Sequence, residues 1–148
     1  MRALVQRVSE AAVSIEGGQA KGIGQGFLVL LGVGSQDTKA EADKLWRKIA
    51  NLRIFPDEEG KTNLNLAQVG GNVLVVSQFT LYANCRRGNR PSFIESASPD
   101  QGEELYEYFK TLVSLEYPDF VCGEFGASMA VSLTNQGPFT IWLDTDQL

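Results

Sequence analysis

Seven consecutive apolar residues, Phe27–Val33, lie between Gly26 and Gly34 without any charged or polar side chain among them. A strand with one face in solvent alternates apolar and polar residues, so an unbroken run of this length predicts a strand buried on both faces. Val73–Val76 has the same character. We therefore expect these two runs to form the centre of a sheet that is covered on both sides.

Shorter alternating patterns predict further strands at the two ends of the sequence. Ala3–Val8 and Val13–Ile15 are apolar patterns separated by Ser9 and Glu10, and the second is expected to turn at Gly17-Gly18. Near the other end, Met129–Leu133 and Phe139–Leu143 alternate in the same way. The residues between them, Asn135-Gln136-Gly137-Pro138, predict a strand, a tight break and another strand.

Two segments have the features of helices. Thr38 and Glu41 have the spacing of a capping box, and the apolar residues that follow recur at helical intervals: Ala42, Leu45, Trp46 and Ile49. Ser98 and Pro99 indicate a second helix start, and its predicted stripe ends before Pro118 and contains Leu105, Tyr108, Phe109 and Leu112. Each stripe is suited to packing against a sheet.

The order of these elements, in 148 residues with 43% hydrophobic and 21% charged composition, predicts an α/β fold. We expect residues 1–148 to form one sheet-rich single-domain sandwich with two main helices. The longest apolar run has seven residues, against the roughly 20 that span a bilayer, and charged residues interrupt Met1–Ser14. A cytoplasmic location with no membrane partner is therefore expected.

The sequence contains no histidine, which removes the usual general base near neutral pH and the Ser-His-Asp and Cys-His arrangements. Cys85 and Cys122 are far apart and form no CxxC pair, so neither a metal site nor a cofactor is expected. The formal net charge of -5 argues against a broad nucleic-acid surface. Any contact with RNA would have to be local.

Three segments could carry chemistry, and each has a simpler alternative. Ser77-Gln78-Phe79-Thr80-Leu81 follows a buried strand and brings hydroxyl and amide groups to a strand end, although it could be a strand that becomes exposed. Gly137-Pro138 could be an ordinary turn. A third segment has positive charges that could bind a phosphate or a carboxylate, although it could also be a solvated surface loop: Arg86, Arg87 and Arg90.

Taken together, Ser77-Gln78-Phe79-Thr80-Leu81 and Asn135-Gln136-Gly137-Pro138-Phe139-Thr140 resemble the signature pair of D-aminoacyl-tRNA deacylases. The resemblance extends over nearly the whole chain, from Met1–Val8 through Arg87-Gly88-Asn89-Arg90-Pro91-Ser92-Phe93 to the C-terminal residues. One departure is Phe139, because the family commonly has valine after the Gly-Pro pair.

The resemblance implies a homodimer in which the Gly137-Pro138 step, with a cis bond, is inserted from one subunit into the site of the other. There the carbonyls of Gly137 and Pro138 would accept hydrogen bonds from the substrate ammonium and crowd its alpha carbon. Such a wall excludes L-residues whatever their side chain, whereas glycine can still enter. The implied substrate is D-aminoacyl-tRNA, with glycyl-tRNA as a second one.

The resemblance also implies roles for individual residues. Ser77, Gln78 and Thr80 would form the catalytic group, and Arg7 would support the Gly-Pro step. Phe79, Phe125 and Met129 would line the substrate pocket, although the last two also fit an ordinary sheet core. Thr80 could act as a nucleophile or as a positioning group. The second role is favoured, because nothing activates its hydroxyl and a vicinal ribose hydroxyl can help to activate water.

Two other functions remain open from the sequence. The first is a freestanding editing module that removes a wrong L-amino acid from tRNA, because the editing domain of archaeal threonyl-tRNA synthetases is similar to this fold. The second is a non-enzymatic, dimeric RNA-binding module that uses Arg86, Arg87 and Arg90. The intact Gly137-Pro138 motif favours the D-specific hydrolase over the first of these.

Overall fold

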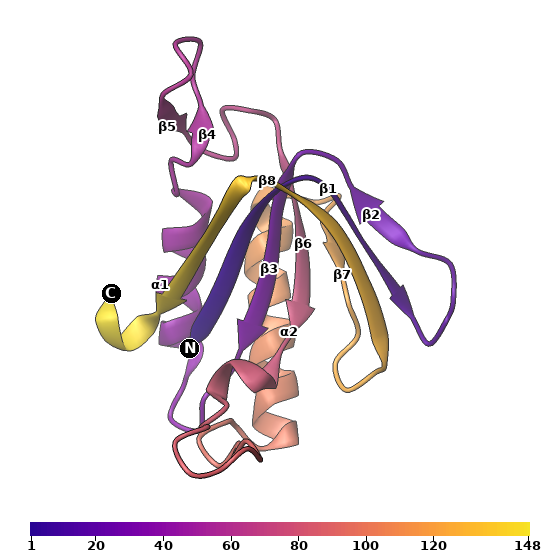
Figure 1. The fold of residues 1–148 in the computed structure, drawn as a ribbon, viewed down its shortest axis with the longest axis vertical. Coiled ribbons are helices and arrows are strands. Elements are labelled where there is room, and N and C mark those ends of the chain that lie inside the picture. The colour runs from indigo at the N-terminus through magenta and orange to yellow at the C-terminus, as the bar shows by residue number, and fades with distance from the viewer.

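The computed structural model describes residues 1–148, and its central layer is a six-stranded mixed sheet (Figure 1). The strands of the whole protein, including the separate pair β4 and β5, are β1 (Arg2–Ile15), β2 (Lys21–Ile23), β3 (Gly26–Gly32), β4 (Phe55–Pro56), β5 (Thr62–Leu64), β6 (Asn72–Ser77), β7 (Val121–Cys122) and β8 (Met129–Asp144). The helices are α1 (Lys39–Ala50) and α2 (Pro99–Glu116), with short 3-10 helices at Phe79–Tyr82 and Thr145–Gln147. This confirms the predicted α/β fold with two main helices.

The sheet is arranged in the order β2-β1-β3-β6-β7, and β8 pairs with β1. β3, β6 and β7 are parallel to one another, whereas β1 is antiparallel to β2, β3 and β8. β4 and β5 form a separate two-stranded hairpin. The two apolar runs of the sequence are thus neighbouring strands at the centre of the sheet, as predicted.

The central strands are buried on both faces, because two different hydrophobic clusters cover them. The first lies under the helices and includes Phe27, Val29 and Leu31 of β3. The second includes Leu28 of β3 and is closed by residues from β1, β2 and β6: Val8, Ala11, Val13, Ile23, Leu74 and Val76. Because β1, β2 and β8 curl over this second face, the sheet has a barrel-like core.

Gly26 lies against β6 at the start of β3, where it pairs with Asn72. A Cβ atom at this position would overlap the carbonyl oxygen of Asn72, its partner across the parallel ladder. A larger residue would therefore push the start of β3 away from β6. The glycine that bounds the first apolar run is needed for the pairing of the two central strands.

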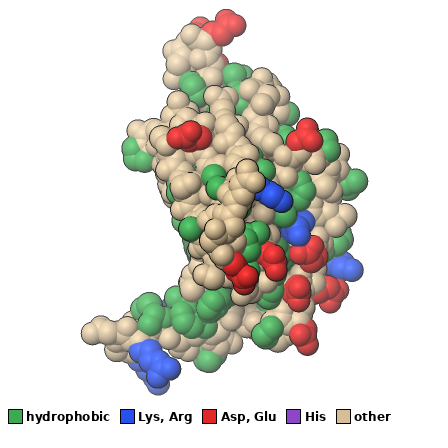
Figure 2. Space-filling view, turned by 90° about the vertical axis from the view of Figure 1, so that its right-hand side faces the viewer, with side chains coloured by type: hydrophobic (Ala, Val, Ile, Leu, Met, Phe, Trp, Pro, Cys, Tyr) green, Lys and Arg blue, Asp and Glu red, His purple; other side chains and the backbone are tan.

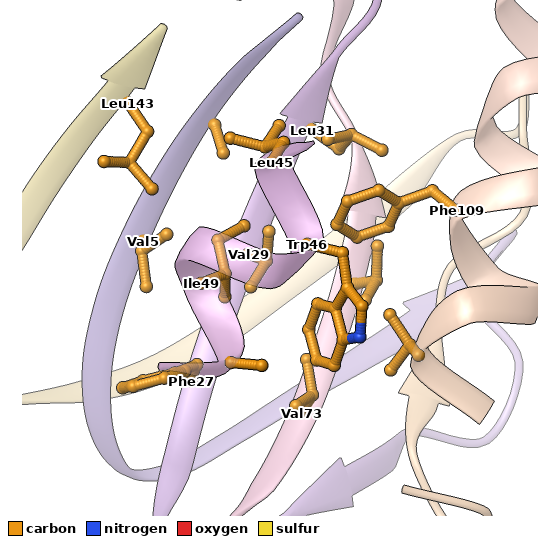
Figure 3. Packing of buried hydrophobic residues seen from close by; sticks show 14 of the residues in the cluster. Val5, Phe27, Val29, Leu31, Leu45, Trp46, Ile49, Val73, Phe109 and Leu143 are labelled. Carbon is orange, nitrogen blue, oxygen red and sulfur yellow. The ribbon is translucent and has the colours of Figure 1, made fainter. Parts of the chain in front are cut away.

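Both helices pack on the same face of the sheet (Figure 1). The capping box of α1 is present: the Thr38 hydroxyl accepts a hydrogen bond from the backbone N–H of Ala40, and Glu41 accepts one from the backbone N–H of Thr38. Ser98 caps α2, and Pro99 occupies its first turn. Figure 3 shows Trp46 of α1 beside Phe109 of α2, with ring centroids 5.8 Å apart in an edge-on contact.

No helix of the protein is both long and apolar enough to cross a membrane.

The two outer patterns of the sequence form longer strands than predicted. The separate N-terminal patterns belong to one continuous strand, β1, because Ser9 and Glu10 stay in extended pairing with β8 or next to it. The predicted break at Asn135–Pro138 is likewise a bulge inside β8 rather than an interruption. Long antiparallel pairing between β1 and β8 holds both segments extended across their polar residues.

Candidate functional site

A pocket of about 400 Å³ opens at the carboxyl end of β6. Its lining contains Ser77 at the strand end, Phe79 from the following 3-10 helix and Phe125 from the segment before β8. Further lining comes from the segment that leads into α2 and from one glycine: Ser96, Ala97, Pro99 and Gly126. No side chain in this lining is ionisable, so the pocket offers hydroxyl groups and apolar surface and no acid or base.

The chain turns sharply between Ser77 and the 3-10 helix. The backbone N–H of Gln78 donates to the carbonyl oxygen of Leu31 over 2.7 Å, which ties the start of the turn to β3. The Gln78 side-chain amide donates to Thr80 Oγ1 over 2.5 Å, and Thr80 and Phe79 are exposed. The Thr80 hydroxyl therefore accepts from Gln78 and keeps its own proton free for another partner.

Arg2 and Tyr82 stabilise this turn. Arg2 Nη1 donates to the carbonyl oxygen of Leu81 over 3.2 Å, its Nε pairs with Asp144 at 2.9 Å, and its guanidinium lies 4.2 Å from the Tyr82 ring centre. Burial, together with the charge of Asp37, raises the pKa of Tyr82 above its ordinary value. Its hydroxyl thus remains a donor to Asp37, at 3.2 Å.

Tyr106 of α2 forms the rear support of the pocket. Its hydroxyl lies 3.1 Å from the carbonyl oxygen of Val75 and 3.0 Å from that of Gly123, and its side chain is fully buried. Burial raises the pKa of this hydroxyl, which keeps it protonated for donation to these two carbonyls. The ring centre lies 6.1 Å from that of Phe125 in the pocket wall.

The second motif forms an exposed bulge on β8. Asn135 pairs with Val8 and Thr140 with Gln6, so the four residues between them stand opposite Arg7 alone. Asn135 closes the base of the bulge, since its side chain donates to Thr140 Oγ1 over 2.8 Å and accepts from the backbone N–H of Phe139 over 2.7 Å. The Gly137-Pro138 bond is cis, and both residues are exposed.

Arg7 contacts this bulge from β1. Its Nε donates to the carbonyl oxygen of Gln136 over 3.0 Å, and its Nη1 donates to the carbonyl oxygen of Ile54. The guanidinium lies 4.7 Å from the ring centre of Phe139. A Cβ added to Gly137 would lie 3.0 Å from Arg7 Nη2, so the bulge and the arginine are closely fitted.

Within one chain the bulge and the pocket lie at opposite ends of the sheet. Arg7 is level with Phe27 and Val73 in the strand register, whereas the pocket opens at Ser77, which is level with Leu31. Four residues along the strands and three strand spacings separate them by about 20 Å. Figure 1 shows the bend of β8 at the upper end of the sheet and the carboxyl end of β6 at the lower end.

All of the predicted site residues except Met129 fall into two groups. Ser77, Phe79 and Phe125 line the pocket, with Gln78 and Thr80 on the adjoining turn. Met129 lies beside Gly123 and packs against the second core cluster instead of the pocket lining. Gly137, Pro138 and Arg7 form the other group, on the bulge.

Sequence reasoning missed several residues of the pocket and its support. They are Arg2, Ser96, Ala97, Pro99 and Tyr106. The helix-start signal at Ser98 and Pro99 was the only available indication, because Ser96 and Ala97 reach the pocket through pairing with Gly34 and Val33 at the end of β3.

Comparison with known proteins identifies the relatives of this chain. A family model described as D-Tyr-tRNA(Tyr) deacylase matches residues 4–144. The chain is 52% identical to a D-aminoacyl-tRNA deacylase of Thermosipho melanesiensis, with 100% of this chain and 99% of the relative aligned. It is 55% identical to a D-aminoacyl-tRNA deacylase of Lacticaseibacillus casei, with 99% of each chain aligned.

Two solved structures are also similar. A c-Myc DNA unwinding element binding protein superposes with a TM-score of 0.91 at 40% identity, covering 97% of this chain and 98% of the other. A probable eukaryotic D-amino acid tRNA deacylase has the same fold, with a TM-score of 0.81 at 18% identity over 96% of this chain and 97% of the other. On the family model and these relatives together, the chain belongs to the D-Tyr-tRNA(Tyr) deacylase family.

Proposed function

We propose that this protein is a hydrolase that cleaves the ester bond of D-aminoacyl-tRNA and thereby removes D-amino acids from mischarged tRNA. The observation that carries the proposal is the pocket beside the Thr80 turn, which is apolar and lacks ionisable side chains. Relatives named D-aminoacyl-tRNA deacylase that align over the whole chain support it. The proposal includes a cytoplasmic location, where charged tRNA is used in translation.

The pocket fits an aminoacyl end more readily than a whole nucleotide. A volume of about 400 Å³ with Phe79 and Phe125 in the wall suits an amino acid and the adjoining ribose. Hydrolysis adds water across the acyl C–O bond and releases the amino acid and the 3′-terminal hydroxyl of the RNA. All of the carbon–oxygen chemistry then takes place next to Ser77 and Thr80.

Selection of the D-form would come from the bulge on β8. Gly137 and Pro138 are exposed, and backbone carbonyls can accept hydrogen bonds from a substrate ammonium. Backbone atoms placed against the alpha carbon exclude an L side chain whatever its size. A pocket that recognises side chains discriminates between them by only about 1 to 3 kcal/mol per methylene, so it cannot exclude every L-residue. Glycine has no side chain to exclude, so glycyl-tRNA is a second proposed substrate.

The separation of bulge and pocket supports a homodimer with shared sites. The bulge lies about 20 Å from the pocket of its own chain, beyond the reach of a bound amino acid. A second copy can bring its bulge to this pocket. β8 retains large exposed apolar side chains, Leu133 and Trp142, which a partner would cover.

One assay distinguishes this proposal from its alternatives. Purified protein is incubated with D-tyrosyl-tRNA, L-tyrosyl-tRNA, glycyl-tRNA and L-seryl-tRNA, and ester cleavage is followed over time. We expect cleavage of the D-tyrosyl and glycyl esters and survival of both L-esters. Cleavage of L-seryl-tRNA would instead support an editing module for a wrong L-amino acid. Binding without any cleavage would support an RNA-binding module.

Thr80 acts in this proposal as a positioning group. Its hydroxyl already accepts from Gln78, and no neighbouring base is available to remove its proton. Backbone N–H groups at the start of the 3-10 helix can donate to the developing oxyanion. The vicinal 2′-hydroxyl of the substrate then helps to activate water.

Replacing Thr80 with alanine tests this mechanism. We expect Thr80→Ala to lower kcat by about tenfold or less, since the backbone donors remain. With the unchanged protein, replacing the substrate by one that ends in 2′-deoxyadenosine should lower kcat considerably more than Thr80→Ala does. A Thr80→Ala protein without measurable hydrolysis, together with normal hydrolysis of the deoxy substrate, would identify Thr80 as the nucleophile.

A further inference from the structure

A loop rich in arginine follows the Thr80 turn. Asn84 and Ser92 close it with two reciprocal backbone hydrogen bonds of 2.7 and 2.9 Å. Between them Arg86, Arg87 and Arg90 are all exposed. The closed base gives the loop a defined position, and the three arginines line one hollow on it.

The positive charge of this loop is not neutralised within the chain. None of the five ion pairs of the structure includes Arg86, Arg87 or Arg90. The three arginines line a hollow of about 370 Å³ whose other walls, Asn84, Ser92 and Ile94, carry no acidic group. Figure 2 shows a group of basic side chains at the tip of the lower-left lobe, apart from the acidic ones on that face.

The loop adjoins the substrate pocket. Phe93, directly after the loop, packs edge-on against Phe79 of the pocket wall, with ring centroids 5.0 Å apart. Asn84 follows Thr80 by four residues, which span at most about 14 Å. A polymer whose end lies in the pocket would therefore pass within reach of the arginines.

We propose that Arg86, Arg87 and Arg90 bind backbone phosphates of the tRNA next to its aminoacylated end. The proposal rests on the proposed function, because it assumes that the aminoacyl group occupies the adjoining pocket. Guanidinium groups form forked, charge-assisted hydrogen bonds with phosphate oxygens. In a chain with a net charge of -5, such a local cluster attracts RNA where general electrostatics would repel it.

Binding and hydrolysis are measured with a triple variant, Arg86→Gln, Arg87→Gln and Arg90→Gln. The matched control removes three exposed positive charges elsewhere, with Lys21→Gln on β2 and Arg47→Gln and Lys48→Gln on α1. Affinity for uncharged tRNA is determined by fluorescence anisotropy over a range of salt concentrations. Hydrolysis is compared between D-tyrosyl-tRNA and D-tyrosyl-adenosine, which has no backbone phosphate.

We expect the loop variant to bind tRNA about tenfold or more weakly than the control variant at low salt. The slope of log Kd against log salt should fall by about two to three, or roughly one for each lost phosphate contact. The ratio of kcat/KM for the tRNA ester to that for the adenosine ester should fall in parallel.

Equal affinities and equal salt slopes in the two variants would overturn the proposal. Failure of the unchanged protein to hydrolyse either ester would refute the proposed function alone, because the anisotropy measurement does not depend on hydrolysis. A change of oligomeric state confined to the loop variant, seen by gel filtration with unchanged tRNA affinity, would assign the arginines to a protein contact instead and also overturn the proposal.

Discussion

At the scale of single residues, Tyr106 connects helix packing to the pocket. Its hydroxyl donates to carbonyl oxygens of both β6 and the Gly123 segment, and its ring packs near Phe125. Tyr106→Phe leaves the Gly123 carbonyl buried without this donor. We expect it to lower the free energy of unfolding by about 1 to 3 kcal/mol, measured by urea denaturation.

The control for this change is Tyr108→Phe on the same helix. Tyr108 donates to Asp43 over 2.9 Å near the surface, where water can replace a lost partner. It should therefore change the urea midpoint much less than Tyr106→Phe. Equal effects of the two substitutions would mean that burial of the Tyr106 hydroxyl contributes nothing specific.

Arg7 is the residue that holds the bulge of β8 in position. Its guanidinium donates to the carbonyls of Gln136 and Ile54, a forked arrangement that the single ammonium group of lysine cannot reproduce. We expect Arg7→Lys to lower kcat/KM for D-tyrosyl-tRNA by about tenfold and to reduce the ratio of D- to L-tyrosyl hydrolysis. Parallel loss on both substrates, with an unchanged ratio, would restrict Arg7 to a general structural role.

The sequence could predict only part of the pocket at this scale. Ser77 and Phe79 follow a recognisable buried strand, so their position at a strand end was predictable. Ser96 and Ala97 reach the pocket by pairing across space with residues at the end of β3, and no local pattern encodes that contact. Tyr106 was missed because it lies outside the apolar stripe that the sequence predicts through Tyr108. In the structure, α2 buries the Tyr106 hydroxyl against backbone carbonyls.

At the scale of elements, the capping box of α1 makes stability depend on pH. The Glu41 carboxylate accepts from the Thr38 hydroxyl over 2.6 Å and from its backbone N–H over 2.7 Å, which lowers the pKa of Glu41 below its ordinary value of 4.5. A carboxylate whose pKa is lower in the folded state than in the unfolded state stabilises the fold. This stabilisation is complete above the pKa of the unfolded state and is lost as the pH falls through the pKa of the folded state.

Glu41→Gln tests this dependence. At about pH 7 we expect a loss of about 0.5 kcal/mol, small because the pair is near solvent. Between about pH 5 and pH 3 the difference from the unchanged protein should shrink, because protonation removes the same carboxylate interaction. Urea midpoints at several pH values measure it, with Glu103→Gln on the exposed side of α2 as the control. A difference that stays constant over this range would contradict the assignment.

The elements themselves were largely predictable where local signals agree with packing. Both helices and the two central strands coincide with capping residues, apolar stripes and continuous apolar runs. The continuity of β1 and β8 was not predictable, because their polar residues suggest interruption. The long antiparallel pairing of the two strands keeps Ser9 and Glu10 within an extended segment, and it continues on both sides of the unpaired bulge that contains Gly137.

At the scale of the whole molecule, the proposed sharing of sites between two subunits predicts complementation between two inactive proteins. Gly137→Val introduces a branched side chain at a φ of 137°, with its Cβ 3.0 Å from Arg7 Nη2, and so disrupts the bulge. Ala97→Trp fills the pocket. Each variant alone should be inactive. Co-expressed in equal amounts, they should recover about a quarter of normal deacylation, since half of the dimers are mixed and each has one intact site.

Recovery would not occur if each chain used its own bulge, because every site would then contain one of the two defects. Activity of the co-expressed pair no higher than that of the separate variants would therefore contradict the shared site. Two different affinity tags on the two variants, with purification on both tags in succession, show that mixed dimers have formed, so that a negative result refers to the site and not to assembly.

The distance between bulge and pocket also has a consequence for protein concentration. If neither half of the site functions alone, specific activity follows the fraction of chains that are paired and falls on dilution below the dimer dissociation constant. Substitutions at Leu133 or Trp142, the exposed residues of β8 proposed to contact the partner, would then act as concentration-dependent defects that vanish at high protein concentration. The cell would thus set the proofreading capacity through the amount of this protein as well as through its turnover rate.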